Sequence, residues 1–286
     1  MLGIKKTFYT AIALFFTFSC NDKPFSMELN VMSFNIRLDR DDGINSWKYR
    51  MPIVKSYLEE TSPDIIGFQE PLQNQVRDLE NMLDVYEWVG DGRNEDRSGE
   101  ACPVFFKKKV FLLLDHDTFW VSDTPNIPGS IGPGAQLPRI VTWVKLKHKE
   151  SEEIVFFFNT HFSHVSADAR KLATQIMSSK MSKIVGDRLL IALGDFNLQQ
   201  GGEEYEFLTE QFGKSNSLVN VQYIAEDVIM GKTTFNGYSR DRERIIDFIF
   251  VSEKFDSLIF RIDEIVENGV FISDHWPLRA TISYSN

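Results

Sequence analysis

Acidic, amide and histidine side chains stand at the ends of several apolar runs, where they could carry out hydrolytic chemistry. The clearest case is LLIALGDFN, residues 189–197, in which five apolar residues precede Gly194, Asp195 and Asn197. Side chains alternate along an extended chain, so Asp195 and Asn197 project to the same side. A carboxylate there can orient water, and an amide can hold a phosphate oxygen. The same residues are also common in polar turns, so this segment alone leaves both interpretations open.

A second set of such residues lies near the C-terminus. In SDHWPLRATI, residues 273–282, Asp274 offers a hard oxygen ligand and His275 a ring that can transfer protons. Upstream, RIIDFIFVS places Asp247 inside an otherwise apolar strand, where an unpaired carboxylate is costly. A histidine is the natural partner, because a carboxylate on one ring nitrogen leaves the other free for a substrate. We therefore expect Asp247 and His275 to form a pair.

Three further strand ends carry residues that could bind a metal ion or a phosphate group. Glu70 follows the run DIIGFQ, and Asn35 ends the run NVMSFN. Glu is a ligand for hard cations, and Asn can support it through its carbonyl oxygen. The run VFFFNTHF places Asn159 and His161 on one face, so a second histidine is available to contact a phosphoryl oxygen. For Asn35, a plain strand-end hydrogen bond is an equally good interpretation.

The elements that must position these residues follow an α/β pattern, in which short apolar runs alternate with helical periodicity. Runs that are apolar on both alternating faces predict strands buried between layers. Helices are predicted after Pro71 and after Ser166, the latter with Leu172, Ile176, Met177, Met181 and Ile184 on its buried face. The predicted strands span residues 29–36, 64–69, 104–106, 140–146, 154–160, 189–193, 245–251 and 280–283.

The beginning of the chain has the anatomy of an export signal. Lys5 and Lys6 precede an apolar run that is too short to span a membrane and that ends at Ser19 and Cys20. A small residue directly before a cysteine resembles the lipobox of bacterial lipoproteins, in which the cysteine becomes the lipidated N-terminus. Thr17 stands where such boxes usually carry Leu, so plain secretory cleavage nearby is the alternative.

These observations predict a signal peptide at residues 1–19, a short tether at 20–27 and one catalytic domain at 28–286. We expect an exported monomer that is anchored to a membrane through Cys20, on the periplasmic side or the outer surface. Its net charge of −10 disfavours binding to long duplex nucleic acid, which depends largely on Lys and Arg. Besides Cys20 only Cys102 is present, so no internal disulfide is expected, and Cys102 is interpreted as a core residue.

Taken together, the motifs resemble those of the endonuclease/exonuclease/phosphatase superfamily, which includes deoxyribonuclease I, abasic-site endonucleases, poly(A) deadenylases, bacterial sphingomyelinases and inositol-polyphosphate 5-phosphatases. The resemblance covers about residues 28–283 and implies a four-layered α/β/β/α sandwich whose motifs meet at one edge. Six matches in the family's order are far more specific than any single one. They are SFN at 33–35, QE at 69–70, NTH at 159–161, GDFN at 194–197, IDFIFVS at 246–252 and SDHWP at 273–277.

The resemblance also implies a metal site and a water-activating group. Glu70 resembles the principal Mg²⁺ ligand, with Asn35 and Asp274 supporting the site and Mn²⁺ as an alternative ion. Asp195 resembles the residue that orients or deprotonates the attacking water, and Asn197 the residue that holds the phosphate. The metal and the hydrogen-bond donors would offset the charge that develops during in-line attack by water.

The two histidines have implied roles as well. His275, paired with Asp247, resembles the family's histidine that contacts the scissile phosphate and has also been assigned as general base. Its role and that of Asp195 therefore cannot be separated at this stage. His161 matches the position that stabilises charge on the phosphate.

The identity of the substrate is open. We expect a metal-dependent phosphodiesterase. The alternatives are an extracellular nuclease for short or single-stranded nucleic acid, a sphingomyelinase-like enzyme suited to a membrane anchor, and a surface binding protein without turnover. The 5-phosphatases usually carry Trp-Cys-Asp-Arg where this chain has IIDF at 245–248, which argues against inositol polyphosphates. Residues 92–108 and 118–130 look like those of a secreted bacterial branch. The candidate rim residues, each of which could equally be an ordinary surface group, are Arg93, Glu100, Arg139 and Asn236.

Overall fold

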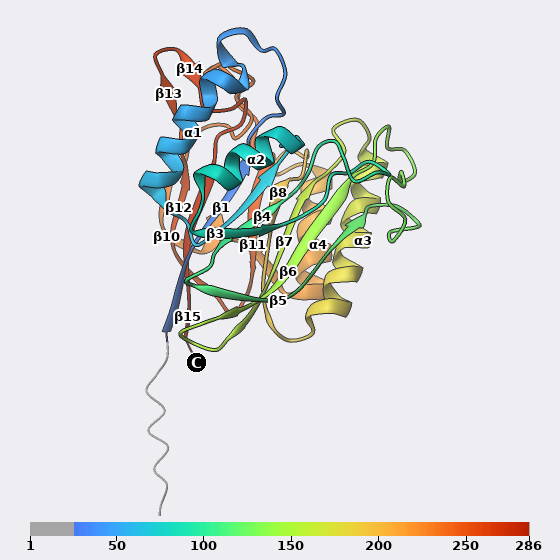
Figure 1. The fold of residues 1–286 in the computed structure, drawn as a ribbon. Coiled ribbons are helices and arrows are strands. Elements are labelled where there is room, and N and C mark those ends of the chain that lie inside the picture. The colour runs from blue at the N-terminus through green and yellow to red at the C-terminus, as the bar shows by residue number, and fades with distance from the viewer. Residues whose placement is uncertain (1–25, 286) are drawn as a thin grey trace, which may run out of the picture.

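The computed structural model describes residues 26–285, which form four layers (Figure 1). Two β-sheets pack face to face in the middle. Helices α1 (Trp47–Thr61) and α2 (Gln73–Met82) cover the first sheet, and α3 (Ala167–Val185) and α4 (Glu203–Asn216) cover the second. The expected α/β/β/α sandwich is therefore confirmed.

The described residues place seven strands in the first sheet, in the order β10-β12-β15-β1-β2-β4-β3, and six in the second, in the order β5-β6-β7-β8-β11-β9. The first sheet contains β1 (Ser26–Asn35), β2 (Ile65–Gln69), β3 (Tyr86–Val89), β4 (Val104–Lys107), β10 (Ala225–Ile229), β12 (Asp256–Ile262) and β15 (Leu278–Ser285). The second contains β5 (Phe111–Trp120), β6 (Ile140–His148), β7 (Ile154–His161), β8 (Leu189–Asp195), β9 (Leu218–Asn220) and β11 (Asp247–Ser252). The shorter elements are η1 (Gly43–Asn45), α5 (Val221–Ile224) and the hairpin of β13 (Val266–Glu267) and β14 (Val270–Phe271).

All eight predicted strands are confirmed, as β1, β2, β4, β6, β7, β8, β11 and β15. Both predicted helices are also present, and the Ser166 side chain caps α3 by accepting the Ala169 N–H. The sequence analysis did not predict α1 or α4. In α1, Arg50 interrupts the apolar stripe and Pro52 lies inside the helix, so the helical pattern is obscured.

Two apolar cores separate the layers. The larger core lies between the two sheets and extends under α1 and α2, while the second core fills the space between the second sheet and α3 and α4. Met177 and Met181 are fully buried in the second core, as predicted. Leu172, Ile176 and Ile184 are only half-buried, because the smaller Ala169 and Ala173 lie on the side of α3 that faces the sheet.

The sheet pairing brings the predicted functional residues to one edge. β1 runs parallel to β2 and β7 runs parallel to β8, so the carboxyl ends of these strands point the same way. His161 is directly opposite Asp195 in the β7–β8 pair. β11 is antiparallel to β8 and places Asp247 opposite Asp195. Residues that are far apart in the chain therefore meet where these strands begin and end.

Within residues 26–285, no helix is both long enough and apolar enough to cross a membrane. The predicted signal peptide at 1–19 and the lipidation site at Cys20 lie outside the described residues, as does most of the predicted tether. β1 begins at Ser26, two residues before the predicted start of the domain.

Gly67 in β2 allows the two sheets to approach each other closely. A Cβ atom at Gly67 would lie 2.4 Å from Leu193 Cδ1 and 2.8 Å from Asn159 Cγ, both in the opposite sheet. Asn159 uses this approach, because its amide donates across the interface to Phe68 O (2.7 Å) and Pro103 O (2.9 Å). The contact therefore fixes the relative position of the two sheets.

We predict that Gly67→Ala lowers the free energy of unfolding by about 1–3 kcal/mol, because the added methyl group overpacks this interface. Gly213→Ala in α4 is the matched control, since no atom lies within 4 Å of a Cβ at that position. It should raise stability by up to about 1 kcal/mol, because alanine has the higher helix propensity. Urea titration followed by circular dichroism measures both changes. Equal stabilities of the two variants would contradict the close approach at Gly67.

Candidate active site

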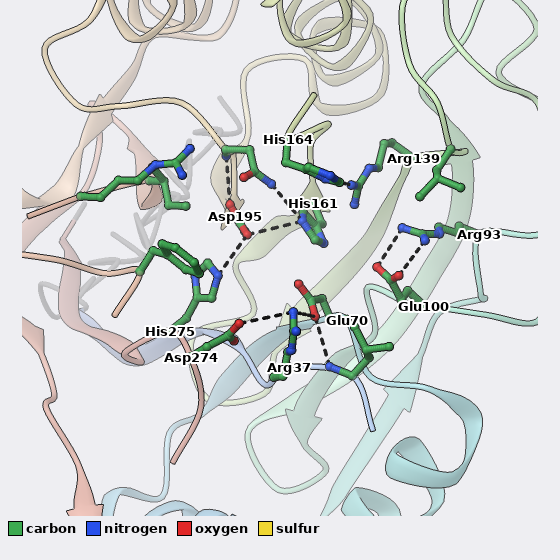
Figure 2. A pocket seen from close by; sticks show the side chains of 16 residues that line it. Arg37, Glu70, Arg93, Glu100, Arg139, His161, His164, Asp195, Asp274 and His275 are labelled. Carbon is green, nitrogen blue, oxygen red and sulfur yellow. Dashed lines mark hydrogen bonds and ion pairs between the residues drawn. The ribbon is translucent and has the colours of Figure 1, made fainter. Parts of the chain in front are cut away.

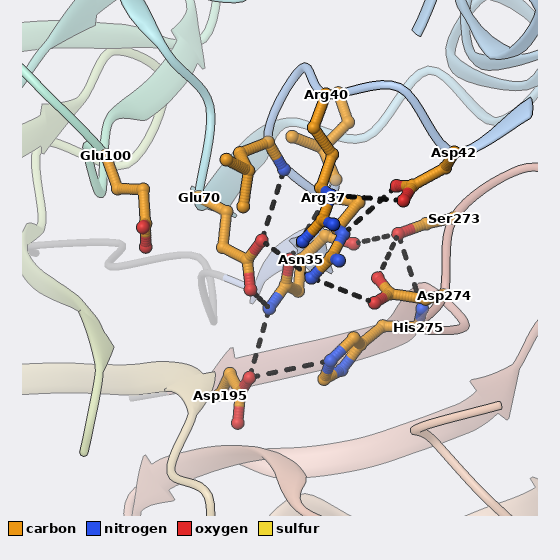
Figure 3. A network of polar contacts seen from close by, with 12 residues as sticks. Asn35, Arg37, Arg40, Asp42, Glu70, Glu100, Asp195, Ser273, Asp274 and His275 are labelled. Atoms are coloured by element: carbon orange, nitrogen blue, oxygen red, sulfur yellow. Dashed lines mark hydrogen bonds and ion pairs between the residues drawn. The ribbon is translucent and has the colours of Figure 1, made fainter. Parts of the chain in front are cut away.

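The Asp195 carboxylate, at the end of β8, is the centre of the predicted site and is 1% exposed. Its Oδ1 accepts the backbone N–H of Asn197 at 2.9 Å. Its Oδ2 accepts from Asn35 Nδ2 at 3.0 Å and lies 3.4 Å from His161 Nε2 and 3.7 Å from His275 Nε2. The structure thus brings together predicted residues from three strands and the segment before β15 (Figures 2 and 3).

His275 and Asp247 form the buried pair that the sequence indicated. His275 Nδ1 lies 2.9 Å from Asp247 Oδ2, and both side chains are almost fully buried. Thr234 Oγ1 accepts the Asp247 N–H at 3.1 Å, and the Phe235 ring lies 5.0 Å from the His275 ring, centre to centre. Asp247 therefore fixes the imidazole at Nδ1 and leaves Nε2 facing Asp195 and the cavity.

The pKa values of the two histidines in the site, His161 and His275, are shifted in opposite directions. Burial alone would lower the pKa of His275, but the carboxylates of Asp247 and Asp195 outweigh it and raise the pKa to about 10. Burial, reinforced by the Arg139 charge, lowers the pKa of His161 well below its ordinary value. His161 Nε2 also lies 3.0 Å from the donor Nδ2 of Asn197, which suits a neutral ring that accepts.

Glu70 and Asp274 form a second acidic group, on the side of Asn35 away from Asp195 (Figure 3). Glu70 is 7% exposed and Asp274 is 4% exposed. Arg37 stands between the two carboxylates, with Nη1 3.3 Å from Asp274 Oδ2 and 3.9 Å from Glu70 Oε2. Burial would lower the pKa of Arg37, but Asp274 and Glu70 raise it overall. A guanidinium therefore occupies the space between two of the predicted metal ligands.

The loop geometry around this group is unusual for residues other than glycine. Arg37 and Glu70 have φ angles of 60° and 72°, in the left-handed region. Side-chain acceptors stabilise the turn at Arg37. The Arg37 N–H donates to Asn35 Oδ1 (3.1 Å), and the Leu38 N–H donates to Glu70 Oε2 (3.1 Å). The left-handed turn at Arg37 also directs the nearby Asp39 away from the site, where it accepts a hydrogen bond from Asn74.

Asn35 connects the two acidic groups through its amide nitrogen. Nδ2 donates to Glu70 Oε1 at 3.1 Å as well as to Asp195, while Oδ1 faces the Arg37 N–H. In this arrangement Asn35 orients carboxylates and does not present its carbonyl oxygen to an ion. Among the described residues, two buried groups have ligand atoms within 4.8 Å of one another and could hold a metal ion: Glu70, His161 and Asp195, and Asp195, Asp247 and His275.

A cavity of about 310 Å³ opens in front of these groups. Three of the predicted rim residues line it, namely Arg93, Glu100 and Arg139. Arg93 and Glu100 form a two-pronged ion pair at 2.6 and 2.8 Å. Asn236 lies behind the cavity and is fully buried, where its amide donates to Ser273 O and its N–H donates to Asp274 O.

Sequence reasoning did not identify several lining residues, among them Arg37, His164, Phe235 and Arg244. The Arg244 guanidinium lies over the Phe235 ring at 5.7 Å. In the sequence, the only indication that this segment lines the cavity is the run of Arg240, Arg242 and Arg244 shortly after the aromatic Phe235. Leu137 and Ile246 add apolar surface to the same cavity.

Known proteins resemble this chain over nearly its whole length. The model of the Endonuclease/Exonuclease/phosphatase family matches residues 32–275. The crystal structure of an endonuclease/exonuclease/phosphatase from Bacteroides vulgatus is 32% identical, with a TM-score of 0.84 over 90% of this chain and 98% of that one. The mannosyl-6-phosphatase of Bacteroides thetaiotaomicron is 27% identical, with a TM-score of 0.81 over 89% and 99%. TDP2 of D. rerio, complexed with a single-strand DNA product, shares the fold at 17% identity and a TM-score of 0.71 over 89% and 98%.

We predict that His275 is protonated and His161 is neutral at pH 7. The pKa of His275 is raised to about 10, whereas burial lowers the pKa of His161 well below its ordinary value. Imidazole ¹⁵N shifts recorded in EDTA check both states, with resonances assigned from His161→Gln and His275→Gln. Asp247→Asn should lower the pKa of His275, because it removes the adjacent anion. A His275 ring that titrates in the wild-type protein would contradict this charge distribution.

Proposed function

This chain belongs to the endonuclease/exonuclease/phosphatase family, whose members are phosphoesterases, and from this premise we propose that it hydrolyses phosphate esters with the assistance of a divalent metal ion. One observation carries the proposal. The Asp195 carboxylate, the His275 ring and the Asn197 amide face one cavity that the Glu70 and Asp274 side chains also line.

Glu70 and Asp274 would hold the ion, with Asn35 orienting Glu70 through its amide nitrogen. Their carboxylates are hard oxygen ligands, and together with Asp195 they carry more negative charge than Arg37 balances, which fits Mg²⁺ or Mn²⁺. The bound ion would stabilise the negative charge that develops on the phosphoryl oxygens. Buried carboxylates of this kind are otherwise costly, so an additional cation suits the site.

Asp195 is positioned to accept the proton of the attacking water. Asn197 N–H and Asn35 Nδ2 hold its two oxygens, so the carboxylate has a fixed orientation towards the cavity. His275 lies between the carboxylates of Asp247 and Asp195, which keeps it charged and makes it a poor base. We therefore assign the base to Asp195 and a hydrogen bond to the phosphate to His275 Nε2.

Asn197 would contact the phosphate, and His161 would orient the Asn197 amide. Asn197 has a φ angle of 54° and its Nδ2 lies 3.0 Å from His161 Nε2 and 3.1 Å from Phe162 O. These two contacts orient the amide and use both of its N–H groups, so a phosphate oxygen would replace one of the two acceptors. His161 acts on the phosphate by orienting this amide, in keeping with its neutral charge state.

For the substrate we favour a phosphate monoester of a small polar molecule. The cavity of about 310 Å³ suits a small ligand, and the similarity to a mannosyl-6-phosphatase supports a monoester. The substrate assay also tests the alternatives. These are the phosphodiesterase expected from the sequence, its nuclease and sphingomyelinase variants, and the binding protein without turnover. Export and membrane anchoring through Cys20 are proposals that rest on the sequence alone.

We predict that Asp195→Asn and His275→Ala each reduce turnover about a hundredfold or more, because each removes a proton acceptor or donor at the reacting phosphate. Purified protein is offered p-nitrophenyl phosphate, bis-p-nitrophenyl phosphate, plasmid and sphingomyelin, with Mg²⁺ and with EDTA. The exposed Asp256→Asn and His116→Ala are the matched controls.

Faster release from the monoester supports the proposed substrate class, whereas turnover of diesters alone restores the sequence-based expectation. Absence of metal-dependent release from every substrate favours the binding protein. Near-wild-type rates in Asp195→Asn or His275→Ala would remove the corresponding role.

We further predict that Arg37→Gln is less stable than the wild type in EDTA by about 1–3 kcal/mol, because Glu70 and Asp274 lose the cation that lies between them. Mg²⁺ or Mn²⁺ should then raise its melting temperature more than that of the wild type. Arg40→Gln is the control, since Arg40 is largely exposed and forms an ion pair with Asp42 of the same loop. Equal metal-dependent shifts in all three proteins would show that Arg37 does not neutralise the metal ligands.

A further inference from the structure

Among residues 26–285, two arginine side chains are almost completely buried, and they differ in how their guanidinium groups are satisfied. Arg50, which is fully buried, donates to four backbone carbonyls: Asn45 O, Ile36 O, Ile272 O and Arg37 O. Arg50 therefore has a structural role, because it connects α1 to the loops that contain these carbonyls. Arg139 is 6% exposed, yet its Nε has no hydrogen-bond partner among the described residues.

The surroundings of Arg139 do not neutralise its charge. Its Nη2 lies 3.1 Å from His164 Nδ1, which a neutral ring can offer as an acceptor. Within residues 26–285, no carboxylate forms an ion pair with it. Glu100, which lines the same wall, accepts from both Nη atoms of Arg93. A buried cation without an anion is costly, so this arrangement requires an explanation beyond packing.

The position of Arg139 indicates what could neutralise it. It lines the cavity together with Arg93 and His164, and Figure 2 shows this wall on the far side of His161 from His275 and Asp274. One half of the cavity therefore carries acids that suit a metal ion, and the other half carries two guanidinium groups and one carboxylate. A guanidinium matches the paired oxygens of a carboxylate or a phosphate.

We propose that Arg139, supported by Arg93 and His164, forms a second anion-binding subsite, which recognises a phosphate or carboxylate on the leaving group of the substrate. This proposal rests on the proposed function, because it places the scissile phosphate on the side of Asp195 and His275. The preferred substrate is then a small molecule with two acidic groups. The second group binds in the half of the cavity that lies beyond His161.

Matched pairs of substrates test the subsite. Phosphoserine differs from phosphoethanolamine by one carboxylate, and fructose bisphosphate differs from fructose monophosphate by one phosphate. The two pairs also distinguish which acidic group is preferred. We expect the wild-type kcat/KM to be at least about tenfold higher for the more acidic member of one pair, the ratio that one charge-assisted hydrogen bond provides.

Arg139→Gln should bring the ratio of kcat/KM between the two members of the pair close to one. A change in kcat/KM that is the same for both members does not affect this ratio. Arg139→Lys should retain part of the ratio, because it keeps the charge and loses the paired geometry. Arg188→Gln, an exposed arginine at the opposite end of β8, is the matched control and should leave the ratio unchanged. Near-ultraviolet circular dichroism confirms that each variant is folded.

Binding in EDTA separates this proposal from the proposed function. Calorimetric titration of the same four compounds, without turnover, should show tighter binding of the more acidic member to wild-type protein but not to Arg139→Gln. This result would support the subsite even if no phosphate ester were hydrolysed. Wild-type ratios near one for both pairs, or ratios that Arg139→Gln does not change, would overturn it.

Discussion

The buried Asp195 carboxylate places the strongest physical constraint on this structure. It is nearly inaccessible to water, so its charge must be satisfied by groups that the fold delivers to it. Asn35 comes from the first sheet, His161 from the neighbouring strand of the second sheet, and His275 from the segment before β15. Because the groups come from both sheets, the sheets must stack in one register for the carboxylate to be tolerated. The close approach at Gly67 fixes that register.

The residues at strand ends could be predicted because their positions follow from local pattern and sheet geometry. An apolar run that ends in an acid or amide predicts a strand and the edge at which its side chain appears, as with Asp195 and Glu70. The pairing of Asp247 with His275 followed from the cost of a lone carboxylate within an apolar strand. The sequence and the free energy of burial are therefore sufficient to predict where these side chains lie.

The remainder of the site depends on contacts that only the folded chain creates. Alternation alone does not show whether Arg37 or Asp39 enters the site, and the left-handed turn at Arg37 decides it. Asn236 was expected at the rim because it is polar, but its partners are backbone groups 37 and 38 residues away. Arg50 likewise obscures α1 in the sequence, since the four carbonyls that satisfy it converge only on folding.

The distribution of charge explains how an acidic protein could select a small anionic substrate. A net charge of −10 opposes the approach of long polyanions, whose binding gains from many cations spread over a surface. The cations that line the cavity are instead few and largely enclosed, with Arg93 and Arg139 on one wall and Arg244 on another. Enclosure strengthens each contact, because fewer water molecules compete for the guanidinium groups. Attraction is therefore confined to ligands that fit inside the cavity: the net negative charge opposes a polymer, whereas the enclosed cations favour a compact anion.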